Sequence, residues 1–287
     1  MPLDPARLMP HAATRPRVMG ILNVTHDSFS DGEKYLDVDD AIRRALEMIS
    51  EGADIIDVGP ESTRPGSTPV APDVQISRAI PVIETINRHA GNVLISIDTR
   101  SAAVAQAALA AGAELVNDVS AMRDDVEMVD VVKRTGAGVV LMHMRGTPAD
   151  MQAEGGPQYA DVVTEVRAFL QERRKFAIAA GIAPERIVVD PGIGFGKRVE
   201  HNLLLLKHVA EFASLRSPVL LGASRKRFLG AVLGLDNPLD REAGSLACAA
   251  YGALGGVAIL RVHAVAPTVQ FVHTLDAIRS AGSERGS

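Results

Sequence analysis

The sequence has no tryptophan, a single cysteine and only 3% aromatic residues. Its core must therefore be packed mainly by Ala, Val, Ile and Leu, and a chain of 287 residues that is 47% hydrophobic is long enough to bury a full core. The one cysteine, Cys248, lies in the small-residue run GSLACAAYGALGG, which predicts a buried, inert thiol in a tightly packed helix. Because a lone cysteine excludes a disulfide framework, we expect a cytoplasmic protein.

The sequence also lacks an excess of basic residues and any long apolar run. Its formal net charge of −5 argues against a general surface for nucleic acid or anionic membrane. No apolar stretch approaches the roughly 18 residues needed to cross a bilayer. Residues 1–17 carry four prolines and no hydrophobic segment of the secretory kind, so we expect an irregular lead-in there. Neither nucleic acid nor a membrane is expected as a partner.

Several standard cofactor and metal motifs are absent. GIGFG at 192–196 does not have the spacing of the dinucleotide fingerprint, and GASRKRF at 222–228 does not have the spacing of a P-loop. The sequence contains no HExxH motif and no CxxC pair, so a structural zinc site is not expected.

Eight short apolar runs alternate with helical patterns along the chain. The runs are nearly continuous in apolar residues, as expected for parallel strands covered on both faces; they lie at 18–23, 54–59, 93–98, 114–118, 138–143, 186–190, 218–222 and 256–263. No break in composition separates them. The pattern predicts a single-domain α/β protein, a (β/α)8 TIM barrel over residues 18–281, followed by a flexible tail at 282–287. A doubly wound open sheet is the alternative, because the number of strands does not prove closure.

Nearly every predicted strand ends in a polar or charged residue. In chain order these residues are Asn23, Asp57, Asp98, Asn117 with Asp118, His143, Asp190, Ser224 with Lys226, and Arg261 with His263. Any one of them has a simple explanation as a helix cap or turn former, which we favour for Asp118 and leave open for Asp57. Eight such ends together predict a functional site, because the carboxyl ends of barrel strands converge on one face.

The polar groups fall into sets with different chemistry. Asp98, Asn117 and Asp190 offer acceptors and an amide that suit a flat heterocycle with N–H donors, although two carboxylates also suit a metal ion or acid–base chemistry. A cationic set, which consists of Arg64, Lys226, Arg261 and His263, favours a phosphate or carboxylate ligand. Long Gly-, Ser-, Thr- and Pro-rich loops follow the first two strands and are typical of loops that close over a substrate.

The motifs themselves resemble those of the dihydropteroate synthases. Over residues 18–280 the chain contains, in the order and spacing of that family, MGILNVTHDSFSDG, DVGPESTRPGS, ISIDT, LVNDVSA, LMHMRGTPADMQ, DPGIGFGK, GASRKRF and ILRVH. The resemblance implies a pterin-binding barrel enzyme of folate biosynthesis. Such a transferase joins 6-hydroxymethyl-7,8-dihydropterin pyrophosphate to p-aminobenzoate, and forms 7,8-dihydropteroate and pyrophosphate.

The resemblance also implies a role for each matching residue. Asp98, Asn117, Met142, Asp190, Lys226 and Arg261 would bind the pterin; Asn23, Arg261 and His263 would bind the pyrophosphate; and Thr63, Arg64, Pro65, Phe195 and Lys226 would bind p-aminobenzoate. Lys226, Asp98, Arg261 and Asn23 are the expected catalytic residues. The implied cofactor is Mg2+, held by Asn23 together with the pyrophosphate oxygens. A homodimer and inhibition by sulfonamides are implied in the same way.

Four positions depart from the pattern of the family. His26 stands where proline is usual, Glu33 replaces a glycine, and Pro60 replaces a glycine before ESTRPG. Arg227 stands where some members carry serine, and it either pairs with the p-aminobenzoate carboxylate or points to water. Two other functions fit part of the pattern: a pterin-binding methyltransferase, and a pterin-binding paralogue without turnover.

Overall fold

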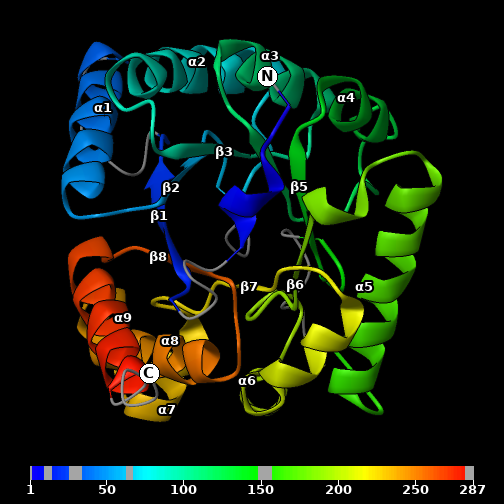
Figure 1. The fold of residues 1–287 in the computed structure, drawn as a ribbon, viewed down its shortest axis with the longest axis vertical. Coiled ribbons are helices and arrows are strands. Elements are labelled where there is room, and N and C mark those ends of the chain that lie inside the picture. The colour runs from blue at the N-terminus through cyan, green and yellow to red at the C-terminus, as the bar shows by residue number, and fades with distance from the viewer. Residues whose placement is uncertain (1, 10–14, 26–33, 63–66, 148–156, 282–287) are drawn as a thin grey trace, which may run out of the picture.

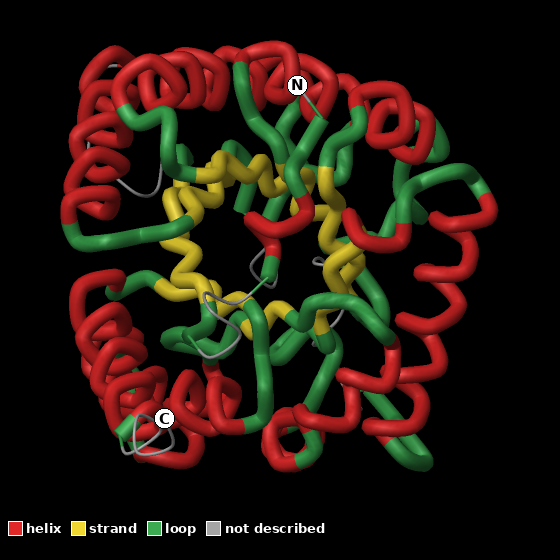
Figure 2. Tube along the Cα trace, in the orientation of Figure 1, coloured by secondary structure: helices red, strands yellow, loops and turns green. Residues whose placement is uncertain are grey.

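Eight parallel strands form one sheet in the order β6-β5-β4-β3-β2-β1-β8-β7. The structure is a computed structural model and describes residues 2–9, 15–25, 34–62, 67–147 and 157–281. Residues 34–37 are described by their backbone only. A parallel bridge between Val189 and Val219 joins the two outer strands, so the sheet closes on itself. Figure 2 shows the resulting ring of strands inside a ring of helices. The predicted TIM barrel is confirmed, and the open sheet is wrong.

The strands are short and lie close to the predicted runs. They are β1 (Arg17–Asn23), β2 (Ile55–Gly59), β3 (Leu94–Asp98), β4 (Leu115–Asp118), β5 (Gly138–Met142), β6 (Ile187–Asp190), β7 (Leu220–Leu221) and β8 (Ile259–Val262). Eight-stranded barrels of this kind are just wide enough for side chains to fill their interior.

Helices cover the outside of the barrel (Figure 1). They are α1 (Lys34–Ser50), α2 (Pro72–His89), α3 (Ala102–Ala111), α4 (Met128–Thr135), α5 (Val162–Ala179), α6 (Val199–Lys207), α7 (Arg227–Leu233), α8 (Glu242–Leu254) and α9 (Val265–Ser280). The described residues also include four short 3-10 helices: η1 (Pro5–Leu8), η3 (Pro184–Arg186), η4 (Val209–Leu215) and η5 (Pro238–Arg241). None of the described helices is long and apolar enough to span a membrane.

Two helical segments differ from the sequence-based expectation. The pattern at 201–215 predicts one helix, but α6 is followed by η4, in which Val209, Phe212 and Leu215 are buried. A 3-10 helix places every third residue on one face, so this spacing is satisfied without an α-helix. The short helix α7 was not predicted, because its interior Gly230 weakens the helical pattern. A side chain at Gly230 would lie 2.5 Å from the carbonyl oxygen of Leu235, so the glycine is required there.

The interior of the barrel begins with an apolar layer that takes one residue from each strand. These residues are Met19, Ile55, Leu94, Leu115, Val140, Val188, Leu220 and Ile259, and all belong to one buried cluster. Because side chains alternate along a strand, the next inward positions lie two residues further on. They include Asp57, Ser96, Asn117, Met142, Asp190 and Arg261. An apolar layer therefore supports a polar layer towards the carboxyl ends of the strands.

The N-terminal lead-in closes the other end of the barrel. Within the segment expected to be irregular, residues 5–8 form η1, seen over the centre of the ring in Figures 1 and 2. Leu3 and Leu8 are fully buried in the same cluster as the apolar layer. Leu3 also donates its backbone N–H to the carbonyl of Gly136, at 3.1 Å. The physical reason is that an open barrel bottom would expose this layer to water.

Leu8→Ala is expected to lower the free energy of unfolding by about 2–5 kcal/mol, because it leaves a cavity beneath the barrel. The neighbouring Met9 is half exposed, so Met9→Ala is the matched control and should cost less than about 0.5 kcal/mol. Equilibrium unfolding in urea measures both. An equal effect of the two substitutions would show that η1 is not part of the core.

Candidate active site

The polar layer and the strand ends form one group of side chains at the carboxyl end of the barrel. Asp98 and Asn117 are directly paired in the register of β3 and β4, and Met142 and Asp190 are paired in the register of β5 and β6. All four side chains are buried. The structure thus brings together the residues that the sequence predicts for the pterin site.

Arg261 lies between two buried carboxylates. Its Nε donates to Oδ2 of Asp57 at 2.6 Å, and its Nη2 donates to Oδ2 of Asp98 at 2.7 Å. Asp57 is fully buried, and it also accepts a hydrogen bond from Nδ2 of Asn117 at 3.0 Å. Asp57 therefore fixes the orientation of both Arg261 and Asn117. The sequence left open whether this residue is a helix cap or part of the site.

Asp98 retains an unsatisfied acceptor. Its Oδ1 is buried and has no hydrogen-bond partner among the residues that the structure describes. Burial raises the pKa of the Asp98 carboxyl to about 7, although the Arg261 guanidinium opposes this rise. Because a buried acceptor without a partner is costly, this oxygen is well suited to accept an N–H from a ligand.

Asp190 and Lys226 form the opposite side of the group. Asp190 accepts the backbone N–H of Gly192 at 2.7 Å, and burial raises its pKa, which the charge of Lys226 opposes. Burial lowers the pKa of the Lys226 ammonium to about 7, with Asp190 opposing that shift. The ammonium donates to the carbonyl of Ile193 and lies 4.3 Å from the centre of the Phe195 ring. Lys226 is thus held by a backbone carbonyl and lies against an aromatic face.

Asn23 and His263 stand at the rim. Asn23 ends β1 beside Gly59, and a side chain at Gly59 would lie 3.6 Å from Oδ1 of Asn23 and 3.8 Å from Cβ of Asp98. Gly59 thus leaves space between these two side chains. His263 follows β8, and its Nδ1 lies 3.0 Å from Oγ of Ser224. Thr63, Arg64 and Pro65, which the sequence predicts for p-aminobenzoate, lie outside the described residues, as do His26 and Glu33.

Two polar residues near the strand ends do not face the barrel interior. Asp118 accepts hydrogen bonds from the backbone N–H groups of Ser120 and Met122, both at 2.8 Å, so its predicted role as a turn former is confirmed. His143 follows the inward Met142, and its ring packs edge-on against Phe169 of α5, with centres 4.9 Å apart. The alternation of side chains along β5 explains why His143 points to the helices.

Lys197 is a residue that sequence reasoning did not single out, although it belongs to the motif DPGIGFGK. It is buried, and its ammonium donates to the carbonyls of Gly192, Phe195 and His143 at 2.8, 3.0 and 3.2 Å. It also lies 2.9 Å from Nδ1 of His143, whose pKa is lowered to about 2 by burial and by the charge of Lys197. Lys197 therefore holds the loop that carries Phe195 against the end of β5.

Two of the positions that depart from the family pattern, Arg227 and Pro60, lie among the described residues. Arg227 is exposed, which fits the alternative that it points to water. Pro60 is buried, and its carbonyl accepts from Nη1 of Arg78 at 3.0 Å. Among the described residues, no three His, Cys, Asp or Glu side chains lie close enough to hold a metal ion by themselves.

Comparison with known proteins agrees with this geometry. The family model described as "Pterin binding enzyme" matches residues 19–263. The dihydropteroate synthase of Mycobacterium leprae is 46% identical over 273 residues, which cover 93% of this chain and 95% of that protein.

Solved structures are similar over the same range. Dihydropteroate synthase of Xanthomonas albilineans with 4-aminobenzoic acid has a TM-score of 0.87 and 43% identity, and the match covers 94% of this chain and 95% of that one. The enzyme of the same organism in complex with 7,8-dihydropteroate has a TM-score of 0.84 and 41% identity, with the same coverage. The chain belongs to the dihydropteroate synthase family of pterin-binding enzymes.

Proposed function

We propose that this transferase condenses 6-hydroxymethyl-7,8-dihydropterin pyrophosphate with p-aminobenzoate in folate biosynthesis. The observation that carries the proposal is the unsatisfied Oδ1 of Asp98, buried beside Asn117 and Arg261 at the mouth of the barrel. In the reaction, the bond between the exocyclic carbon of the pterin and the pyrophosphate oxygen breaks. The aryl amine then forms the new C–N bond and loses a proton.

The pterin is proposed to lie across the polar layer. Asp98 and Asp190 offer acceptors for the N–H groups of the ring, and Asn117 offers an amide that Asp57 already orients. Met142 belongs to a buried apolar cluster against which Phe195 packs, and it would give the flat ring an apolar contact. These acceptors are fixed before the ligand binds, so they can stabilise positive charge that develops on the pterin as pyrophosphate departs.

The pyrophosphate is proposed to bind at the rim, near Asn23, Arg261 and His263. Arg261 lies in β8, and His263 is the first residue after this strand, two positions further along the chain. The Asn23 amide oxygen, with the free space beside Gly59, fits one protein ligand of Mg2+ whose other ligands are pyrophosphate oxygens and water. When bound, this ion would supply positive charge that neutralises the leaving group.

The p-aminobenzoate is proposed to bind between Lys226, Phe195 and the loop after β2. The Phe195 ring and the Lys226 ammonium are already in contact, and Lys197 fixes the backbone beneath them. Thr63, Arg64 and Pro65 would complete this pocket. Such an arrangement holds the amine near the reacting carbon, which is the main contribution of positioning to the rate.

The assay that tests this function is pyrophosphate release that requires both substrates. Release with both, and not with either alone, is the expected result. No release, together with retained pterin binding, would favour a pterin-binding paralogue without turnover. Transfer of a methyl group from a folate would instead favour the methyltransferase. Competition by a sulfonamide against p-aminobenzoate in the same assay tests the expected inhibition.

A homodimer is proposed from an apolar face on consecutive C-terminal helices. Large exposed apolar side chains lie on α7, α8 and α9 and on the segment before α8; they are Val232, Leu233, Leu239, Tyr251, Leu254 and Ile278. These helices lie next to one another (Figure 1). Large exposed apolar side chains on adjacent helices are typical of an interface. We also propose a cytoplasmic location, which suits the free, buried thiol of Cys248.

Lys226→Ala is expected to lower kcat/KM by about 100-fold or more, because it removes a preorganised charge from the reacting groups. The fold should be unchanged, since α7 begins at the next residue and its apolar contacts remain. Steady-state kinetics and thermal denaturation measure the two effects. Lys207→Ala, at the exposed end of α6, is the matched control. Near wild-type turnover by the Lys226 variant would reject its role.

Pterin binding is expected to weaken as the pH falls below 7. The pKa of Asp98 in the folded protein is about 7, so the carboxylate gains a proton below that pH and loses acceptor capacity. The Kd of the pterin should rise about tenfold per pH unit below 7 and level off above it.

Calorimetric titration between about pH 5.5 and about pH 8.5 measures this dependence. The Asp98→Asn variant should bind the pterin weakly, and its Kd should not depend on pH over this range. Lys226→Met, which removes the other group with a pKa of about 7, should retain the dependence on pH. A wild-type Kd that does not change over this range would contradict the role of Asp98.

Leu254→Glu is expected to give a monomer. Leu254 is 60% exposed in the single chain, and a glutamate there would place a charge in the proposed interface. Val126→Glu, at an exposed apolar residue before α4, is the control and should leave the association unchanged. Light scattering after gel filtration measures the mass. A monomeric wild-type protein would reject the dimer.

A further inference from the structure

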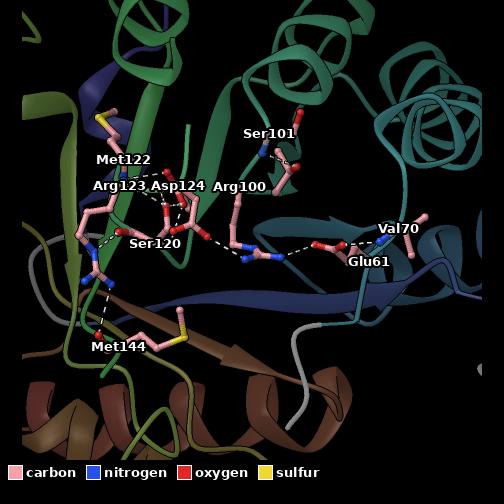
Figure 3. Close-up of polar contacts among 11 residues, drawn as sticks. Glu61, Val70, Arg100, Ser101, Ser120, Met122, Arg123, Asp124 and Met144 are labelled. Carbon is pink, nitrogen blue, oxygen red and sulfur yellow. Dashed lines mark hydrogen bonds and ion pairs between the residues drawn. The ribbon is translucent and has the colours of Figure 1, made fainter. Parts of the chain in front are cut away.

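The two described ends of the loop after β2 are tied to each other by one carboxylate. Glu61 follows β2, and its side chain is buried although it is charged. Its Oε1 accepts the backbone N–H of Val70, at 2.7 Å, on the returning side of the loop (Figure 3). The contact fixes the separation of the two ends of an eight-residue segment, 62–69.

Other side chains hold the same two ends. The Nε2 of Gln75, which is buried in α2, donates to the carbonyl of Val70 at 2.9 Å. Thr99, just after β3, donates through its hydroxyl to Oε1 of Gln75 at 3.2 Å. Both backbone groups of Val70 are therefore bonded, and the base of the loop is held from α2 and from the end of β3.

Arg100 connects this base to the next two loops of the barrel. Its Nη2 donates to Oε2 of Glu61 at 3.2 Å, and its Nη1 donates to Oδ2 of Asp124 at 2.7 Å (Figure 3). Glu61 follows β2, Arg100 follows β3 and Asp124 follows β4. A planar guanidinium can bridge two carboxylates in this way, whereas a lysine ammonium is a single point of charge.

The loop after β4, which carries Asp124, is held by hydrogen bonds of its own. The Oγ of Ser120 accepts the backbone N–H of Asp124 at 3.3 Å, and Arg123 donates to the carbonyls of Ser120 and Met144 at 2.8 and 3.2 Å (Figure 3). The buried carboxylate of Glu61 needs a partner of opposite charge, and Arg100, which is itself bonded to Asp124 of this loop, provides it.

We propose that Arg100 is a positioning residue for p-aminobenzoate, acting through Glu61 on the loop after β2. This inference rests on the proposed function, in which residues 63–65 of that loop contribute to the p-aminobenzoate pocket. Arg100 touches neither substrate in that arrangement. Its loss leaves the pterin residues Asp98, Asn117 and Asp190 in place, because none of the contacts described for them involves it.

Arg100→Met is expected to raise the KM for p-aminobenzoate by at least about tenfold. The KM for the pterin pyrophosphate and the calorimetric Kd of the pterin should stay within about twofold of wild type, a split that general loss of structure would not produce. Arg134→Met is the matched control, because Arg134 also makes a side-chain hydrogen bond, at 3.0 Å to Gln106, but lies on α4 in the helical layer.

Two further variants separate position from charge. Arg100→Lys keeps the charge but not the bridge, and should show an intermediate rise in the KM for p-aminobenzoate. Glu61→Gln keeps an acceptor for Val70 but removes the ion pair. In a double-mutant cycle, Arg100→Met and Glu61→Gln should have less effect together than the sum of their separate effects. Additive effects would reject action through Glu61.

The wild-type assay distinguishes failure of this inference from failure of the proposed function. If the wild type does not condense the two substrates, the function and the inference are both rejected. If it does, an unchanged KM for p-aminobenzoate in Arg100→Met, or an equal rise in both KM values, rejects the inference alone. Should Arg100→Met fold poorly, Arg100→Lys and Glu61→Gln give the same comparison.

Discussion

The contact on which the site depends is the placement of Arg261 between Asp57 and Asp98. Two carboxylates in the interior of a barrel are unfavourable unless a cation is close to both, and the bonds of 2.6 and 2.7 Å provide that cation from β8. Asp57 in turn orients Asn117. The acceptors and the amide at the mouth of the barrel are therefore fixed as one connected group, and Oδ1 of Asp98 remains available to a ligand.

The position of this group follows from the alternation of side chains along short parallel strands. An apolar layer with one residue from each strand, such as Ile55 and Ile259, lies beneath the polar layer, whose members come two residues later, such as Asp57 and Arg261. The N-terminal Leu3 and Leu8 cover the apolar layer from below. One end of the barrel is therefore closed for stability, and the other carries the chemistry.

Two loops at the carboxyl ends of the strands are each held in place by a basic side chain. Lys197 fixes the loop of Phe195 through three backbone carbonyls, and Arg100 ties the base of the loop after β2 to the two loops that follow it. In both cases a basic side chain is bonded through its N–H groups to the protein itself. The two side chains hold the surroundings of the proposed p-aminobenzoate pocket without occupying it.

The sequence by itself determined the eight strands and the residues at their ends, because apolar runs and local motifs are short-range signals. It favoured a barrel, but closure of the sheet was decided by the bridge between Val189 and Val219. Convergence of the strand ends predicted a shared site, and the family resemblance implied that Asp98, Asn117, Asp190, Lys226 and Arg261 bind the same ligand. Only the tertiary structure decided that Asp57 belongs to that group, that His143 faces the helices, and that Lys197 and Arg100 hold loops. The buried lead-in around Leu8 was likewise not readable. The reason is that each of these depends on contacts between distant residues, such as Arg261 with Asp57, 204 positions apart, and no local pattern specifies the partner of a side chain.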